Sequence, residues 1–203
     1  MKRRALLTLS AGAAAFVLGG RRPTPVVTAD PHEGRDSFGL ELADLNPDRM
    51  WPVYRRYHLL IVGQRDDERS SALTAAVVDV LSHYLPSSRP QLVSAADARR
   101  VGVLIATDQQ DVAIMQAESA EALFLAKPPF ADIPDAPLRI IVSFGSHVLV
   151  CRPNFMARHA YLLAKTLADH AEGLPAPAAA PGGVVPAHRG SHAFFAGEEI
   201  PND

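Results

Sequence analysis

The chain has 203 residues, of which 48% are hydrophobic and 21% are charged, a composition that excludes both a disordered polymer and a protein with many membrane spans. Of its 20 basic residues, five lie in the first 29 positions, where there is no acidic residue; this leaves 15 basic against 22 acidic residues in the rest. An acidic domain of this size is poorly suited to a phosphate backbone, so we expect no nucleic-acid partner. The single cysteine, Cys151, excludes an intramolecular disulfide and a multi-cysteine metal site.

Residues 1–29 predict a signal peptide or an N-terminal anchor. Lys2-Arg3-Arg4 precedes an apolar run over residues 5–18, which is shorter than the roughly 20 residues that span a bilayer. The paired arginines resemble a twin-arginine signal, and the small residues at 27–29 offer a cleavage site. We therefore expect a periplasmic protein, which stays membrane-anchored if the signal is not cleaved.

The first elements of the mature chain follow a polar, turn-rich lead-in over residues 30–52. An apolar run over residues 58–63 predicts a strand that is buried on both faces. Apolar residues at helical spacing predict a helix over residues 69–84, with Asp66 or Asp67 as its N-cap and Pro86 at its end.

Strands and helices alternate through the following part of the chain. Strands are expected over residues 91–94, 111–117, 138–142 and 147–151, and helices over residues 97–107, 119–126 and 155–172. This alternation predicts an α/β lobe over residues 30–174, with a largely parallel sheet flanked by helices. Residues 175–203 form a Pro/Ala/Gly linker followed by a C-terminal tail, and the linker is expected to be extended or mobile.

Three ordered motifs carry a resemblance to a known family. The first is Asp111, Ala113 and Gln116; the second is Tyr161, Leu163 and Lys165; the third is Pro186, His188, Gly190, Phe194 and Phe195. Together they cover roughly residues 58–200, and this pattern resembles the TAXI family of solute-binding proteins of TRAP-type transporters. The resemblance implies a periplasmic-binding-protein-like lobe and a small carboxylate or amino acid ligand, which is passed to a membrane permease.

The chain also departs from that family in two ways. Family members are about half as long again and hold the ligand in a cleft between two α/β lobes, whereas here the strand ending at Cys151 leads almost directly to the helix at Phe155. Most of the second lobe is therefore missing. In the family a Gly- and Tyr-rich loop after the first strand presents small residues to a ligand carboxylate. Residues 64–69 replace it and include three consecutive acids, which repel an anion.

Seven residues are candidates for ligand binding. Ser70 and Ser71 lie in the first turn of a helix, where free N–H groups favour an anion; the alternative is an exposed first turn with Asp66 or Asp67 as the internal anion. Gln116, Glu118 and Ser119 lie where a strand meets a helix, a place where open α/β sheets bind ligands. The alternative is that they cap the short helix expected over residues 119–126. The full set is Gln64, Ser70, Ser71, Gln116, Glu118, Ser119 and His188.

Catalytic and metal sites find little support in the sequence. His188 and His192 are four residues apart near Glu198 and Glu199, but Pro186 and Gly190 argue against a helix there. Ser146 precedes His147, and adjacent residues on a strand point to opposite faces. Cys151 ends an apolar run, as a small buried residue does. There is no nucleophile elbow, Walker loop or dinucleotide fingerprint, so we expect no enzyme, no metal and no cofactor.

Two main hypotheses follow for the function. In the first, the protein captures a small organic acid or amino acid for a TRAP-type transporter. In the alternative, a degenerate binding-protein fold acts as an adaptor or accessory subunit for a periplasmic enzyme, transporter or sensor. The tail over residues 184–203 then reaches a partner or packs back on its own lobe. A metal-binding or catalytic domain built on His188 and His192 is a third hypothesis.

Overall fold

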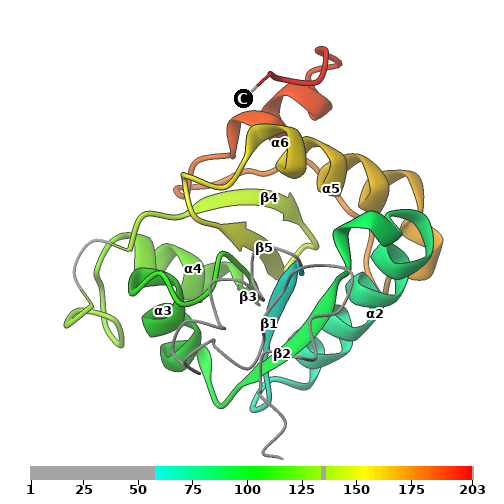
Figure 1. The fold of residues 1–203 in the computed structure, drawn as a ribbon. Helices are drawn as coiled ribbons and strands as arrows, with labels where there is room; N and C mark the ends of the chain where they lie inside the picture. The colour runs from blue at the N-terminus through cyan, green and yellow to red at the C-terminus, as the bar shows by residue number, and fades with distance from the viewer. Residues whose placement is uncertain (1–57, 134–135, 203) are drawn as a thin grey trace, which may run out of the picture. The chain divides into compact units, whose positions relative to one another are not determined.

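The computed structural model describes residues 58–133 and 136–202, which build a five-stranded sheet in the order β2-β1-β3-β5-β4 (Figure 1). Strand β1 (Leu60–Gln64) pairs in parallel with β2 (Gln91–Ala95) and with β3 (Val112–Gln116). Strand β5 (His147–Cys151) runs antiparallel to both β3 and β4 (Arg139–Ser143). The predicted α/β class is confirmed, but the sheet is mixed, because β4 and β5 form a hairpin.

Helices cover both faces of the sheet (Figure 1). Helices α2 (Glu68–Tyr84) and α5 (Ala157–Asp169) pack on one face, with α6 (Arg189–Phe195) beside α5. Helices α3 (Ala98–Ala106) and α4 (Ala117–Phe124) pack on the other face. Two short 3-10 turns, η2 (Pro86–Ser88) and η3 (Ala171–Gly173), follow α2 and α5.

Buried strands supply apolar side chains to two separate cores. Ile61 joins the core under α2 and α5, whereas its neighbour Val62 joins the core under α3 and α4. Successive side chains of a strand point to opposite faces, so a sheet covered on both sides needs nearly continuous apolar strands. All five residues of β1 and all five of β5 are buried, which explains the unbroken apolar runs of the sequence.

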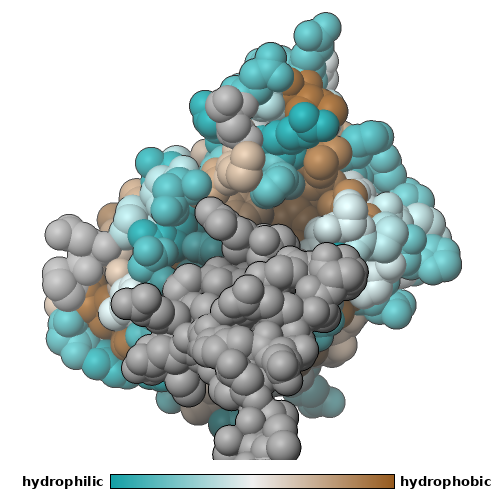
Figure 2. All heavy atoms as spheres, in the orientation of Figure 1, coloured by the Kyte–Doolittle hydropathy of each residue, from teal (hydrophilic) through white to brown (hydrophobic). Residues whose placement is uncertain are grey.

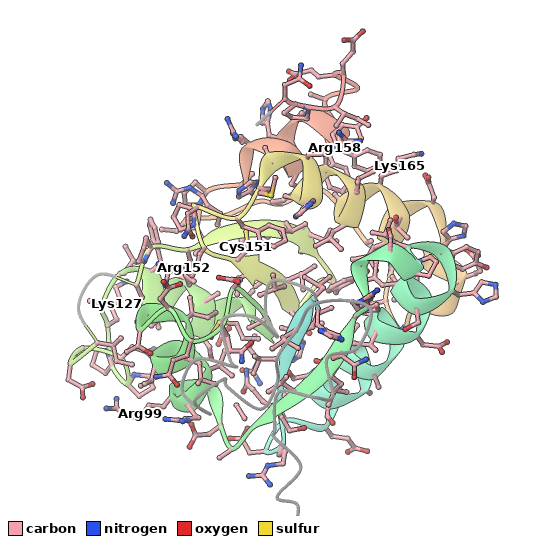
Figure 3. All side chains as sticks on the ribbon, viewed as in Figure 1. Arg99, Lys127, Cys151, Arg152, Arg158 and Lys165 are labelled. Atoms are coloured by element: carbon pink, nitrogen blue, oxygen red, sulfur yellow. The ribbon has the colours of Figure 1, made fainter. Side chains whose placement is uncertain are left out.

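Short polar contacts fasten the helix ends. Asp67, one of the two predicted caps, is the N-cap of α2, and Asp97 caps α3 through a bond from the Arg100 N–H (2.7 Å). Arg152, just after β5, donates to the Ile105 carbonyl near the end of α3 (3.0 Å) and pairs with Asp108 (3.0 Å) (Figure 3). These contacts tie the strand ends to the helices that cover them.

The C-terminal tail packs back on the lobe and ends in a helix. The expectation that residues 188–192 are not helical is wrong: His188 is the N-cap of α6, and Gly190 lies within it. A Cβ on Gly190 would lie 1.9 Å from the Ala157 carbonyl oxygen, so only glycine lets α6 approach α5 this closely. Ala179 of the linker and Ala187 of the tail pair with the outer edge of β4.

The predicted signal peptide or anchor and the lead-in lie outside the described residues. Within the part of the chain that the structure describes, no helix is long and apolar enough to cross a membrane.

Candidate functional site

The candidate site is a cluster of polar side chains around Asp67, at the edge of the sheet where β1, β3 and β4 have their carboxyl ends. Because β5 runs the other way, its first residue, His147, lies at this same edge. From β1 the chain passes to β2 on one side, and β3 lies on the other side of β1. This is a topological switch point, and open α/β sheets bind ligands in the crevice outside it.

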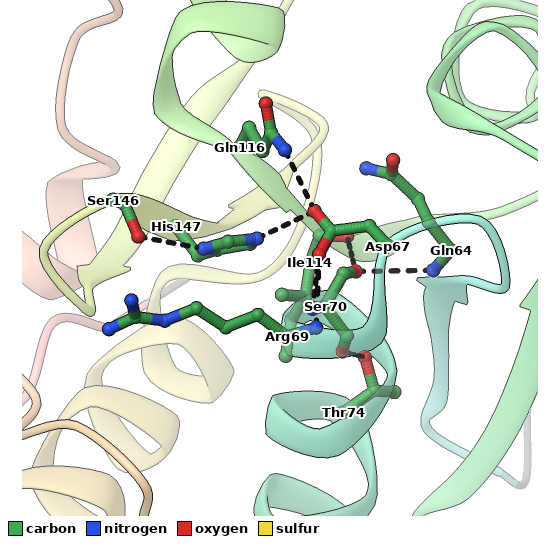
Figure 4. A network of polar contacts seen from close by, with 9 residues as sticks. All are labelled: Gln64, Asp67, Arg69, Ser70, Thr74, Ile114, Gln116, Ser146 and His147. Atoms are coloured by element: carbon green, nitrogen blue, oxygen red, sulfur yellow. Dashed lines mark hydrogen bonds and ion pairs between the residues drawn. The ribbon is translucent and has the colours of Figure 1, made fainter.

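Asp67 is the centre of this cluster (Figure 4). Its Oδ1 accepts hydrogen bonds from the backbone N–H groups of Arg69 (3.0 Å) and Ser70 (3.1 Å). Its Oδ2 accepts from Gln116 Nε2 (3.0 Å) and lies 2.8 Å from His147 Nε2. Both oxygens are therefore satisfied by groups of the protein itself.

The environment of Asp67 favours its ionised form. Burial by itself raises the pKa of this carboxyl, but the hydrogen bonds from His147, from the Ser70 N–H and from Gln116 outweigh it and hold the pKa below its usual range. A carboxylate at a helix N-terminus is also favoured by the helix dipole. The start of α2 thus already holds an internal anion, as one of the two sequence-based alternatives expected.

Ser70 is a buried structural residue and is not part of an exposed first turn. Its Oγ accepts from the Gln64 N–H (3.1 Å) and donates to the Ile114 carbonyl (3.1 Å), so its hydroxyl ties α2 to β1 and β3. Thr74 donates to the Ser70 carbonyl one turn later (2.7 Å). Ser71 is exposed, as the alternative expected.

The remaining candidates at this edge differ in how they are held. Gln64 is 3% exposed, and its side-chain Nε2 has no hydrogen-bond partner among the described residues. Gln116 is exposed and bonds Asp67. Glu118 and Ser119 lie in the first turn of α4, exposed and half-buried respectively, and no hydrogen bond between described residues joins them to Asp67. The structure thus brings Gln64, Ser70 and Gln116 together around Asp67.

His188 does not join this cluster. It is 2% exposed, and its Nδ1 accepts from the Gly190 N–H (3.2 Å) at the start of α6. Its ring contacts Phe155, which follows β5 at the opposite, amino edge of the sheet. Burial lowers the pKa of His188 below its usual value. These contacts give His188 a place in the packing of the tail.

Sequence reasoning missed His147. Ser146 lies in the β4–β5 turn and not on a strand, so its Oγ reaches His147 Nδ1 (3.0 Å). When Nε2–H donates to Asp67, Nδ1 is the ring nitrogen that accepts the Ser146 hydroxyl. Serine, histidine and aspartate are hydrogen-bonded in this same sequence in a Ser-His-Asp catalytic triad. His147 is 3% exposed, so its ring is packed inside the protein. Through Nε2 the imidazole holds the Asp67 carboxylate in position.

Two hollows lie elsewhere among the described residues. One, of about 460 Å³, lies at the amino edge, between the start of β1 and the start of α5. Figure 2 shows hydrophobic atoms gathered beneath α5 and α6, the helices on this side. The other, of about 570 Å³, runs beside β2 and α3. Neither is lined by Asp67, Gln116 or His147.

Two further chemistries can be judged from the described residues. No group of three or more His, Cys, Asp or Glu side chains among them is placed to hold a metal ion. Burial raises the pKa of the Cys151 thiol well above its ordinary value, so the thiolate that a nucleophile needs does not form at neutral pH.

No protein-family model matches the sequence, and a search of curated proteins finds no relative. The resemblance to TAXI proteins therefore remains a prediction that rests on the three motifs.

Proposed function

We propose that this chain is an exported, one-lobed member of the solute-binding type whose ligand edge is closed, and that it works as an adaptor or accessory subunit for a periplasmic enzyme, transporter or sensor. The observation that carries this proposal is the Asp67 carboxylate at the switch point, with both oxygens satisfied by the protein.

The anion position at the start of α2 supports this reading. A small carboxylate would need the free N–H groups of the first helical turn. Two of them, on Arg69 and Ser70, are already bonded to Asp67. A ligand carboxylate placed there would meet a like charge held at short range, which disfavours its binding.

The topology gives a second line of support. In a two-lobed binding protein the chain must leave the first lobe at the ligand edge. Here β4 and β5 are joined at that edge by residues 144–146 only, with Gly145 at φ +76°. The link between Cys151 and Phe155, where the sequence suggested the missing lobe, lies at the opposite edge. The ligand edge is therefore closed by a tight turn.

Solute capture for a TRAP-type permease is the second candidate function. The buried Gln64 Nε2, which has no partner among the described residues, favours it, because an unpaired buried donor is costly and a ligand oxygen would satisfy it. The ligand would be a small carboxylate or an amino acid, and a second lobe would have to come from another chain.

A thermal-shift screen of the purified chain against sulfate, small carboxylates and amino acids separates the two functions. The adaptor function predicts no shift for the wild type. It also predicts that Asp67→Gly, which frees two N–H groups at little cost to the N-cap, gains stabilisation by sulfate. A ligand at 100 times its Kd stabilises by about 2.7 kcal/mol, or several degrees.

The control for this screen is Asp66→Gly, which removes a neighbouring charge but no cap contact. A clear shift of the wild type with an organic acid would contradict the adaptor function and establish solute binding. Export is tested separately, by fractionation and N-terminal sequencing of the chain and of its Arg3→Lys/Arg4→Lys variant. Recovery of the wild type from the cytosol would contradict it.

A further inference from the structure

No described residue pairs with the outer edge of β2, whereas the other edge strand, β4, has partners on its outer side. The Gln91 N–H bonds the Leu59 carbonyl (2.9 Å) and the Ala95 carbonyl accepts from the Arg65 N–H (3.0 Å). In a parallel pair alternate residues face the neighbouring strand, so Leu92 and Ser94 direct their N–H and C=O groups outward. No described residue bonds these groups.

The strand itself lacks the usual protection of an edge. Natural edge strands carry charges, prolines or bulges that prevent pairing with another chain. Strand β2 has the sequence Gln-Leu-Val-Ser-Ala and pairs regularly with β1 over its whole length. The Leu92 side chain is 43% exposed. This edge is thus suited to accept a further strand.

A groove of about 570 Å³ lies beside the edge and provides room for side chains of an added strand. Its apolar lining includes Val93 and Leu104, and its charged lining consists of Arg65, Arg100 and Asp97. Asp97 already accepts the Arg100 N–H as the cap of α3. The two arginines outnumber this one carboxylate, so the lining carries a net positive charge.

Arg89 adds to this positive charge at the start of β2. It is exposed and lies two residues before the strand. The β2 edge is thus flanked by Arg89 at one end and, at the other, by Arg65 and Arg100 beside the exposed carboxylates of Asp66 and Asp97. The three arginines outnumber these two acids, so the strip is basic overall on a chain whose remaining sequence after residue 29 is acidic, and opposite charge on a partner would complement it.

The same sheet shows how an extended segment covers an edge. On β4, the Ser143 N–H and C=O exchange bonds with Ala179 (3.0 and 2.9 Å). The Ile140 N–H bonds the Pro186 carbonyl (3.0 Å), and the His188 N–H bonds the Ile140 carbonyl (2.8 Å). The tail therefore acts as a discontinuous edge strand for β4, and β2 has no equivalent among the described residues.

A second copy of this chain is a poorer occupant than an acidic segment. Two β2 strands paired antiparallel about Val93 would place Arg89 of each copy opposite Asp97 of the other, beside its Arg65 and Arg100. Each end of the pairing would then hold three arginines against Asp66 and Asp97, so the excess of like charge opposes it.

We propose that the outer edge of β2 is the docking site for an extended, acidic segment of a partner protein, which adds to the sheet as a sixth strand. The inference rests on the proposed adaptor function and names its surface and the chemistry of its partner. Main-chain bonds to Leu92 and Ser94 provide the pairing, and the flanking arginines select acidic side chains.

The test uses the full chain and a fluorescein-labelled, end-capped peptide, Glu-Val-Glu-Val-Glu-Val, with the Lys-Val peptide as its counterpart. Fluorescence anisotropy gives Kd, and amide hydrogen exchange reports on Leu92 and Ser94. We expect binding of the acidic peptide only, with slowed exchange at these two amides. Arg65→Glu/Arg100→Glu should weaken binding about tenfold or more.

Matched variants separate edge pairing from general charge. Ser94→Pro removes one outward N–H, as edge prolines do, and should abolish binding, whereas Ser94→Ala should not. Arg69→Glu reverses one charge, half the change of the double variant, on a side chain that extends away from β1 (Figure 4), and it should leave Kd unchanged.

Three outcomes would overturn the inference: no protection of the Leu92 and Ser94 amides at millimolar peptide, equal binding of the Lys-Val peptide, or a dimer in sedimentation equilibrium that Arg65→Glu/Arg100→Glu strengthens. If Ser94→Pro does not fold, the arginine pair still decides. Failure here with a flat ligand screen leaves the adaptor function standing, whereas a ligand shift of the wild type removes that function itself.

Discussion

The two outer edges of the sheet, on β4 and on β2, differ in their hydrogen-bond partners. The edge of β4 is covered by the tail, which contributes backbone bonds from Ala179, Pro186 and His188 and then closes with α6. The edge of β2 has no such cover among the described residues. Unpaired sheet edges tend to pair with other chains, so the difference teaches that the C-terminal segment stabilises the β4 edge, whereas no described segment does so for β2.

This contrast also explains the tail residues that resemble a family signature. Of the motif, His188 caps α6 and Gly190 permits the contact with α5; next to them, outside the motif, the Ser191 hydroxyl donates to the Ile141 carbonyl of β4. All three act on packing, at an edge far from Asp67. The most specific motif of the sequence therefore reports on the fold and carries no direct information about a ligand.

The largest effect on stability is expected at the outer edge of β4, from Gly190→Ala. The added Cβ would lie 1.9 Å from the Ala157 carbonyl oxygen, so α6 must move away from α5. We expect a loss of about 3 kcal/mol in the free energy of unfolding, measured by urea denaturation. Gly182→Ala is the control, because no heavy atom lies within 4 Å of its Cβ position. Equal stability of the two variants would show that α6 does not secure this edge.

A smaller loss is expected from Ser191→Ala. The change removes the hydroxyl that bonds the Ile141 carbonyl in the buried interface between α6 and β4. Leaving that carbonyl without this donor should cost about 1–2 kcal/mol. Ser71→Ala, on an exposed part of α2, should stay within about 0.5 kcal/mol of the wild type. Both are measured by urea unfolding, and a neutral Ser191→Ala would contradict the role of the hydroxyl.

The stability of the tail packed on the β4 edge should also depend on pH through His188. Its pKa in the folded state is lowered by burial, so the unfolded chain binds more protons at mildly acidic pH. Stability is therefore full above the ordinary histidine pKa of about 6.5 and falls as the pH drops from there towards the folded-state pKa. His188→Asn keeps a capping side chain without a titrating group. Its Tm should fall less than that of the wild type between pH 7.5 and pH 5; parallel curves would rule out this contribution.

The smallest effect on stability is expected at the outer edge of β2, from Leu92→Lys. The side chain is 43% exposed, and lysine is a common guard of edge strands. The free energy of unfolding should change by less than about 0.5 kcal/mol, measured by urea denaturation beside Leu73→Lys, which introduces charge into the core and should unfold the protein. A loss of 2 kcal/mol or more at Leu92 would show that this edge is covered in the protein.

The sequence predicts where the helices and strands lie better than it predicts the direction in which each strand runs in the sheet. The α/β class, the position of α2 and its cap at Asp67 follow from apolar spacing and from residues that compete for backbone N–H groups. The direction of β5 does not follow, because a strand buried on both faces reads as the same apolar run in either orientation. The β4–β5 hairpin becomes visible only through the antiparallel pairing of these two strands, as between Ser143 and Val148.

The site and the tail helix were missed for related reasons. Helix α6 has only seven residues and contains Gly190, so local propensity argues against it and packing on α5 decides. His147 begins an apolar run, and no spacing rule connects it with Asp67, 80 residues earlier. Contacts of this kind depend on the order of strands in the sheet, which is a property of the whole fold.

Cys151 has a practical consequence of its own. It is the single cysteine of the chain, it is buried, and burial keeps its thiol protonated. In an oxidising compartment it offers no partner for mixed disulfides, so the molecule needs no cysteine-free background for labelling. A reporter thiol introduced on the surface, for example by Leu92→Cys, will react alone with a maleimide dye and place a fluorophore on the outer edge of β2 in the native protein.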